Sequence, residues 1–148
     1  MKDKNLEYNL QSIEEIDLSL GVFSDKSIKL ISKFIFEKLE ILDLTSNNLT
    51  SLSFIDNLKF VKENDITSSN DYQFIKDMSE YPLKKLFLTN NEISDINKLC
   101  KLTKLEEVKL QNNSIIINQS INNIVEKIES LNKILLFGNK IERKNDSD

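Results

Sequence analysis

The chain has 148 residues and a formal net charge of −4, with 39% hydrophobic and 30% charged residues. This length suits one domain, and this balance is that of a soluble folded protein. The acidic charge and the absence of any block of basic residues argue against a protein that mainly grips nucleic-acid backbones, because such binding depends on clustered lysine and arginine.

Residues that the chain lacks exclude further kinds of chemistry. It contains no histidine, the usual general base and zinc ligand, and its single cysteine, Cys100, cannot form an internal disulfide. A lone thiol favours a reducing compartment. The N-terminal sequence MKDKNLEYNL carries charges unlike a signal peptide, and no run reaches the ~20 apolar residues of a membrane span. We therefore expect an intracellular protein, cytoplasmic or nuclear, with no metal, cofactor or membrane anchor.

One pattern recurs along the chain. Apolar residues occupy its first, fourth, sixth and eleventh places, and asparagine occupies the ninth. An early copy begins at Ile13, with Gly21 at the ninth place, and four clean copies begin at Leu39, Leu83, Leu105 and Leu131. The alternation at the fourth and sixth places predicts a short half-buried strand in each copy. Stacked copies predict a parallel sheet over a continuous core.

The segments between these strands predict returning helices. After Ser24 and Asp25, a true helix is expected, with a buried face of Ile28, Ile31 and Ile35. Shorter 3₁₀ or helical returns are expected over 52–58 and 96–102. A second true helix is expected to start at Ser120 as its cap, with a buried face of Ile121, Ile124, Ile128 and Leu131.

A sixth copy would begin at Val61, because the neighbouring copies lie 44 residues apart, twice the 22-residue spacing that follows. The phase is kept there, but Asn64 and Asp71 stand at apolar places. Two hypotheses remain for the region 59–72: a degenerate but ordered repeat, which we favour, or a loop inserted between two intact repeats.

The asparagines at the ninth place predict a structural ladder. Each would turn inward just after its strand, and its amide would bond backbone groups of the bend and of the adjoining coil. Removing such a buried partner should cost about 1–3 kcal/mol. The predicted ladder consists of Asn47, Asn91, Asn113 and Asn139.

The pattern L-x-x-L-x-L-x-x-N-x-L over residues 13–141 resembles the leucine-rich repeat family. The stretch LKKLFLTNNEISDINKLCKLTKL, from Leu83 to Leu105, is similar to the short 22-residue intracellular class. That class includes the phosphatase-1 regulatory subunit, the spliceosomal A-prime protein and the acidic nuclear phosphoproteins. The resemblance implies an α/β solenoid of about six units, with parallel strands on the concave side and short helices or 3₁₀ turns on the convex side. It also implies binding of another protein on the concave side, and no enzymatic activity.

We interpret residues 1–148 as a single domain, with an N-terminal flank (1–12), the repeats (13–141) and a short polar tail (142–148). Members of the class often close with a C-terminal cap that carries an N-P and an L-D-x motif. The ending IERKNDSD has neither motif, so we expect an uncapped last repeat.

The third, fifth and seventh places of each copy should face the concave side. In the first three copies, fifth places predict a row of like charges, formed by Asp17, Asp43 and Asp65. Like charges on neighbouring strands repel, so a basic partner would relieve the row. The alternative is that these aspartates are ordinary solvated residues of the repeat.

In the last three copies, the same places predict apolar anchors for a partner among basic residues. The anchors are Phe87, Leu135 and Phe137, and the basic residues are Lys85, Lys109 and Lys133. Exposed aromatic side chains on a sheet are typical of binding hot spots. The alternative is that Leu135 and Phe137 fold over the open end as a makeshift cap.

These patterns favour a non-enzymatic adaptor or structural subunit that binds a protein partner of unknown identity. Two alternatives follow from the resemblance. The chain could be a protein component of a ribonucleoprotein, with direct RNA contact a minor part of binding, or it could regulate a protein phosphatase.

Overall fold

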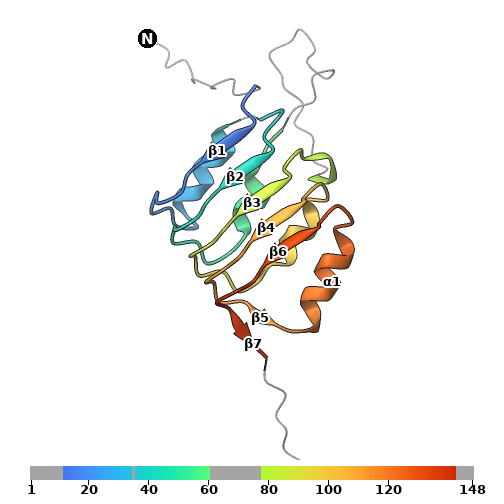
Figure 1. Cartoon of the computed structure of the whole chain (residues 1–148). Coiled ribbons are helices and arrows are strands. Elements are labelled where there is room, and N and C mark those ends of the chain that lie inside the picture. The colour runs from blue at the N-terminus through green and yellow to red at the C-terminus, as the bar shows by residue number, and fades with distance from the viewer. Residues whose placement is uncertain (1–11, 35, 61–77, 143–148) are drawn as a thin grey trace, which may run out of the picture.

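The fold is built on a parallel sheet of five strands, each three residues long, in the order β1-β2-β3-β4-β6. The computed structural model describes residues 12–34, 36–60 and 78–142 (Figure 1). Because all pairs are parallel, every strand is followed by a segment that returns to the start of the next one. The strands are β1 (Glu15–Asp17), β2 (Ile41–Asp43), β3 (Lys85–Phe87), β4 (Glu107–Lys109) and β6 (Lys133–Leu135).

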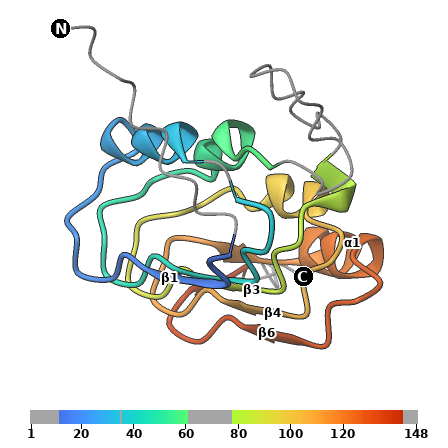
Figure 2. The same cartoon turned by 90° about the horizontal axis from the view of Figure 1, so that it is seen from above.

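The returning segments form a second layer opposite the sheet (Figure 2). It contains 3₁₀ helices η1 (Ser27–Lys33), η2 (Ser53–Asn57), η4 (Met78–Glu80) and η5 (Asn97–Lys101), and one α-helix, α1 (Gln119–Lys127). Two further short strands, β5 (Ile116–Ile117) and β7 (Lys140–Ile141), pair in parallel near the C-terminal end.

The core lies between the two layers and follows the predicted alternation. The middle residue of each inner strand points inward and is fully buried, as Leu42, Leu86 and Val108 show, whereas the flanking residues face outward. Each such burial stabilises the fold by about 1.5–3 kcal/mol. One coil cannot bury these side chains alone, so stability comes from stacking coil on coil.

The favoured prediction of a sixth repeat within the stack is wrong. Strand β2 pairs directly with β3, with Leu42 opposite Leu86 and Asp43 opposite Phe87, so no strand from the intervening segment lies between them. Residues 61–77, which include Asp65, lie outside the described residues. The pairing supports the alternative of an insertion. A sequence reason is that Asn64 and Asp71 stand at places that are buried and apolar in the intact repeats.

The two coils that flank this insertion are joined by specific contacts. The rings of Phe60 and Tyr81 meet edge to face, with centroids 5.3 Å apart, and both residues are buried. On the helical side, the Asp56 carboxylate bonds to Lys98 and to Lys101, whose Nζ is 2.7 Å away. The hydrogen bond from Lys101, followed by that from Lys98, lowers the pKa of Asp56 below its ordinary value. The bonded residues are 42 and 45 positions apart in the sequence, so the coils before and after the insertion are direct neighbours in space.

The two long returns differ from each other. The second is the α-helix α1, which confirms the prediction; Ile121 and Ile124 are buried on it, Ile128 is buried at its C-cap, and Leu131, also expected on this face, is only partly buried. Its cap is Asn118 rather than the expected Ser120, because the Asn118 side chain accepts the Ser120 backbone N–H at 3.0 Å.

The first long return was expected to be a true helix and is instead the 3₁₀ helix η1. The Ser24 hydroxyl accepts the backbone N–H of Ser27, and the Ser27 hydroxyl accepts that of Ser24, so each backbone N–H at its start is satisfied by the other side chain. Its residues Ile28 and Ile31 are buried.

Candidate protein-binding surface

The asparagines at the ninth place hold neighbouring strands together. Asn91 donates from Nδ2 to the carbonyl oxygens of Leu44, in the preceding coil, and Leu88, in its own coil, at 2.9 and 3.1 Å. Its Oδ1 accepts the backbone N–H of Leu49 at 3.0 Å. The same double bridge is made by Asn47, Asn113 and Asn139. These bonds satisfy buried backbone groups at the bend and fix the strand ends that carry the outward-facing residues.

The ladder also explains why the first coil has no asparagine at its ninth place. Each asparagine reaches back to the coil before it, and within the described residues no strand precedes β1. The position is taken by Gly21, where an added Cβ would lie 2.3 Å from the Phe23 ring. A side chain there would displace that ring and would meet no preceding coil among the described residues.

The eighth place carries a backbone signal that the sequence interpretation missed. Every coil of the stack turns there through a left-handed conformation, with φ between 55° and 79°. Asparagine and glycine adopt this region most readily, which accounts for two asparagines and one glycine among the five residues. The residues are Leu20, Ser46, Asn90, Asn112 and Gly138.

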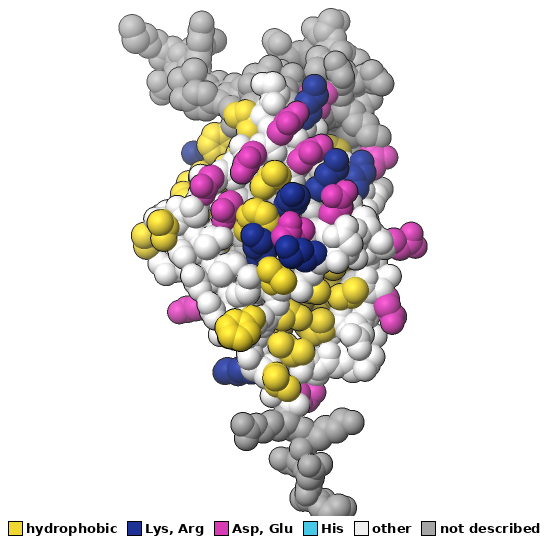
Figure 3. All heavy atoms as spheres, in the orientation of Figure 1, with side chains coloured by type: hydrophobic (Ala, Val, Ile, Leu, Met, Phe, Trp, Pro, Cys, Tyr) yellow, Lys and Arg dark blue, Asp and Glu magenta, His cyan; other side chains and the backbone are white. Residues whose placement is uncertain are grey.

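We call the outward-pointing side of the five strands the sheet face. Its N-terminal part is acidic, as Figure 3 shows over β1 and β2. Asp17 and Asp43 are register neighbours, but the next neighbour of Asp43 is Phe87, so the predicted row of three aspartates is wrong. Asp65 lies outside the described residues, and Glu15 is the further carboxylate of this part.

Both aspartates also have a local structural role. Asp17 accepts the backbone N–H of Ser19 at 2.8 Å, and Asp43 accepts that of Thr45 at 2.9 Å, so each carboxylate closes the turn after its own strand. The hydrogen bonds from the side chain and the backbone of Ser19 lower the pKa of Asp17. Both aspartates are thus built into the strand ends.

The middle of the sheet face carries an aromatic ring beside cations. Phe87 is half-buried, and the Lys109 ammonium lies 4.3 Å from its ring centroid, a cation–π contact between register neighbours. Lys85 lies between Ile41 and Glu107 in register. Glu107 in turn forms an ion pair with its next register neighbour, Lys133, with 3.3 Å between Oε1 and Nζ. The sequence interpretation had not assigned Glu107, although its place in the repeat is that of Lys85.

The C-terminal part of the sheet face is apolar. Leu135 is half-buried on β6, whereas Phe137 is 84% exposed. A ring so exposed covers little of the last coil, which disfavours the alternative of a makeshift cap. Hydrophobic side chains gather beside β6 and toward β7 in Figure 3. The register thus brings Phe87 and Leu135 onto one face with Lys85, Lys109 and Lys133, and the exposed Phe137 follows two residues after the end of β6.

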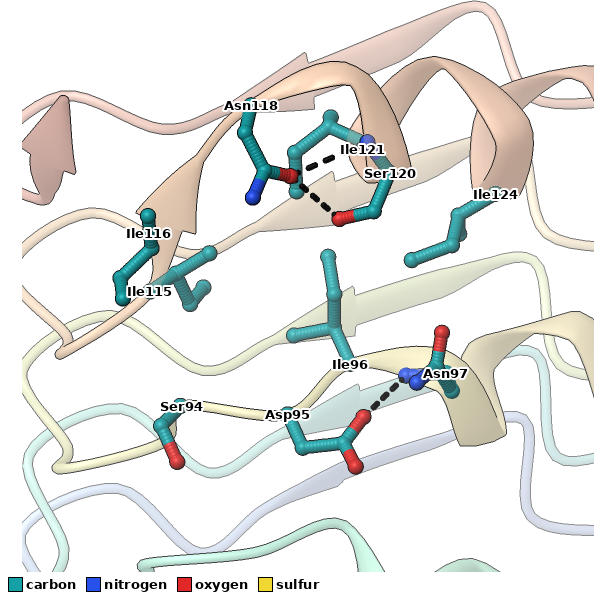
Figure 4. Close-up of a pocket in the computed structure, with 10 residues that line it drawn as sticks. All are labelled: Ser94, Asp95, Ile96, Asn97, Ile115, Ile116, Asn118, Ser120, Ile121 and Ile124. Atoms are coloured by element: carbon teal, nitrogen blue, oxygen red, sulfur yellow. Dashed lines mark hydrogen bonds between the residues drawn. The ribbon is translucent and has the colours of Figure 1, made fainter. Parts of the chain in front are cut away.

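A separate cleft of about 220 Å³ opens between the turn before η5 and helix α1 (Figure 4). Its apolar wall includes Ile96, Ile115 and Ile121. The polar groups at its rim bond locally: Asp95 accepts the N–H of Asn97, and Asn118 accepts that of Ser120. The cleft lies where a coil with a short 3₁₀ return meets one with a longer helical return.

Two further observations concern chemistry and membranes. No group of three or more metal-ligating side chains occurs among residues 12–34, 36–60 and 78–142. Within these same ranges, every helix is too short or too polar to cross a bilayer.

Comparison with known proteins gives structural matches only. No protein-family model and no curated protein matches the chain. The crystal structure of internalin C2 from Listeria monocytogenes shares 21% identity at a TM-score of 0.51, covering 90% of this chain and 56% of that one. A second Listeria monocytogenes internalin (inlF) shares 21% identity at a TM-score of 0.53, covering 97% and 40%.

The chain therefore spans little more than half, or less, of these two solved proteins. At this identity the likeness shows the fold alone. Internalins are leucine-rich repeat proteins, and the stacked parallel strands of this chain have the same architecture. The chain has the leucine-rich repeat solenoid fold.

Proposed function

We propose that the protein is a non-enzymatic adaptor or structural subunit that binds a protein partner on its sheet face, the concave side expected from the sequence. The observation that carries this proposal is the exposure of Phe137, which is 84% accessible at the edge of a face that also presents Phe87 and Leu135. Aromatic side chains in such settings become anchors when a partner removes them from water.

The sheet face is preorganised for binding. Its strands are fixed by the asparagine ladder, and the Phe87 ring is positioned by Lys109. A partner that docks here therefore loses little free energy to ordering this chain. Lys133 is already paired with Glu107, so the partner meets a partly neutralised middle with apolar anchors beside it.

The acidic part of the sheet face would set the direction in which a partner docks. Glu15, Asp17 and Asp43 lie at one end of the face, and the apolar anchors lie toward the other. A partner with basic residues at one end of its contact surface and apolar residues at the other would dock in one direction. Such charge pairing mainly speeds encounter and depends on salt.

The carboxylates of the face support a binding role rather than acid–base catalysis. Asp17 and Asp43 accept backbone N–H groups, and Glu107 pairs with Lys133. The chain also has no histidine. The 22-residue unit from Leu83 to Leu105 further supports placing the chain in the short intracellular class of leucine-rich repeats.

The test compares two matched truncations of exposed apolar side chains. Phe87→Ala with Phe137→Ala removes the anchors of the sheet face, and Leu30→Ala removes a side chain that is 37% exposed on η1, in the opposite layer. Proteins captured from extract of the source organism by the wild-type chain are identified, and affinities are measured with purified partner. We expect Leu30→Ala to keep the affinity and the double variant to lose tenfold or more, about 1.4 kcal/mol. Equal affinity of all three chains would refute the assignment of this face.

A further inference from the structure

The C-terminal end of the stack is an unfinished coil interface. In the coil before it, Leu105, Val108, Leu110 and Ile115 are buried at 0–1% exposure. In the last coil, Leu131, Ile134 and Leu136 at the corresponding places are only partly buried, and Ile141 is 75% exposed. The same four places thus change from core to surface, because no coil among residues 12–34, 36–60 and 78–142 stacks on them.

Backbone polar groups at this end also lack the bonds that an asparagine of a further coil would make. In the preceding coil, the Ile115 N–H and the Leu110 carbonyl bond to Asn139. Their counterparts are the Ile141 N–H and the Leu136 carbonyl, and within the described residues the Leu136 carbonyl is bonded only by Asn139 of its own coil. No described strand pairs with the outer edge of β6.

The backbone directions at that edge follow from the pairing with β4. The Lys133 N–H donates to Glu106, and the Leu135 carbonyl accepts from Leu110. The N–H and carbonyl of the intervening Ile134 must therefore point outward, together with the Asn132 carbonyl and the Leu136 N–H. This arrangement is self-complementary about Ile134, because an antiparallel copy would pair the two Ile134 residues and set each Asn132 carbonyl against a Leu136 N–H.

We propose that this end binds the same end of a second copy, forming a two-fold dimer through antiparallel pairing of the two β6 strands. The five-stranded sheets would continue into each other, and the exposed apolar places would be covered on both chains. The inference is independent of the partner-binding role, although the two sheet faces would then form one continuous surface.

The alternative head-to-tail contact with a second copy is disfavoured by the ladder. The coil that would stack on β6 would be the first coil of the other chain, and it carries Gly21 where the ladder needs asparagine. Such a contact would also leave one open end at each step and grow into filaments.

The test is sedimentation of the full chain over a range of about 1–300 µM, with two variants that each place a charge on an exposed aliphatic residue. Ile141→Glu alters the C-terminal end, and Leu20→Glu, at a residue 77% exposed, alters the opposite end. We expect dimers in the wild type and in Leu20→Glu, and at least a tenfold weaker association in Ile141→Glu. A monomer throughout, filament growth, or a dimer that only Leu20→Glu disrupts would overturn the proposal.

Amide hydrogen exchange gives a second readout that does not depend on a variant. The Leu136 N–H should exchange more slowly as the concentration rises, whereas the Leu110 N–H, already bonded to Leu135 within the sheet, should not change. A dimer in which exchange at Leu136 is independent of concentration would exclude pairing through β6.

Discussion

The side-chain amide of Asn91 donates to the carbonyl oxygen of Leu44, 2.9 Å away and 47 residues earlier in the chain. The equivalent bond from Asn113 reaches Leu88, only 25 residues earlier. Both bonds join one coil to the coil before it, so the ladder follows spatial neighbours rather than sequence distance. The extra 22 residues equal the length of one inner unit, which is why the inserted segment keeps the phase of the repeat without adding a strand to the sheet.

The ladder makes Asn91 a strong determinant of stability. Asn91→Ala would leave the buried Leu49 N–H without its partner, and the Leu44 carbonyl would keep only the Asn47 amide of its two side-chain donors. We expect the free energy of unfolding to fall by about 2–3 kcal/mol. Urea denaturation measures it, with Asn123→Ala on the exposed side of α1 as the control, which should be neutral or slightly stabilising. Equal effects of the two substitutions would contradict the ladder's role.

Gly138 is required by both its conformation and its surroundings. Its φ is +79°, and an added Cβ would lie 2.0 Å from the Asn112 Oδ1. Gly138→Ala should lower the free energy of unfolding by about 1–2 kcal/mol. In the background of Asn112→Gly, which removes the clashing side chain, the same substitution should cost less. A double-mutant cycle by thermal unfolding tests this, and strict additivity would show that Asn112 plays no part.

The buried hydroxyl of Tyr81 has no hydrogen-bond partner among the described residues. Tyr81→Phe should therefore leave the free energy of unfolding at neutral pH unchanged or raise it by up to about 1 kcal/mol. Tyr81→Leu, which also removes the edge-to-face contact with Phe60, should instead destabilise the protein. Chemical denaturation distinguishes the two, and a marked loss of stability in Tyr81→Phe would reveal a bond that the described residues do not supply.

The same hydroxyl predicts a dependence on alkaline pH. Burial raises the pKa of Tyr81 above its ordinary value of 10.0, so the folded state resists ionisation that the unfolded state permits. Its contribution is complete below pH 10 and is lost progressively as the pH rises above it. Between about pH 9 and 11, stability should fall more steeply in the wild type than in Tyr81→Phe. Parallel curves for the two proteins would exclude this ionisation.

Acid should weaken the contact between η2 and η5. The bonds from Lys101 and Lys98 lower the pKa of Asp56 below 3.8, so the stabilisation is present above that pH and disappears as the pH falls through the lowered value. The difference in unfolding free energy between wild type and Asp56→Asn should shrink below pH 3.8. Asn123→Ala, at an exposed and non-ionisable position of α1, serves as the control with no such trend. A constant difference down to pH 2 would contradict the ion pairing.

Much of the stack could be predicted from the sequence, because burial imposes a strict spacing. Leu42, Leu86 and Val108 had to be apolar for neighbouring coils to share a core, and the inward asparagines had to follow them. The segment from Val61 was harder to interpret, since phase alone does not show whether a copy enters the sheet. The pairing of Asp43 with Phe87 could be found only in the structure, where the aromatic Phe87 is the register neighbour that the sequence had predicted to be Asp65.

The candidate surface was predictable in its members but not in their contacts. The places of Phe87, Lys109 and Phe137 follow from the repeat, whereas the cation–π contact and the 84% exposure of Phe137 depend on side-chain conformations. Helix α1 begins two residues earlier than predicted, so its cap is Asn118 and not Ser120. The spacing of hydrophobic residues does not define the start of a helix to within two residues.

Site-resolved photo-crosslinking with the identified partner tests the binding role of the sheet face most directly. A photoreactive phenylalanine analogue replaces Phe87 on the sheet face in one chain and Leu30 on η1 in another. We expect the partner to be joined efficiently from position 87 and at background level from position 30. Efficient joining from position 30 with none from position 87 would place the partner on the helical layer and contradict the account.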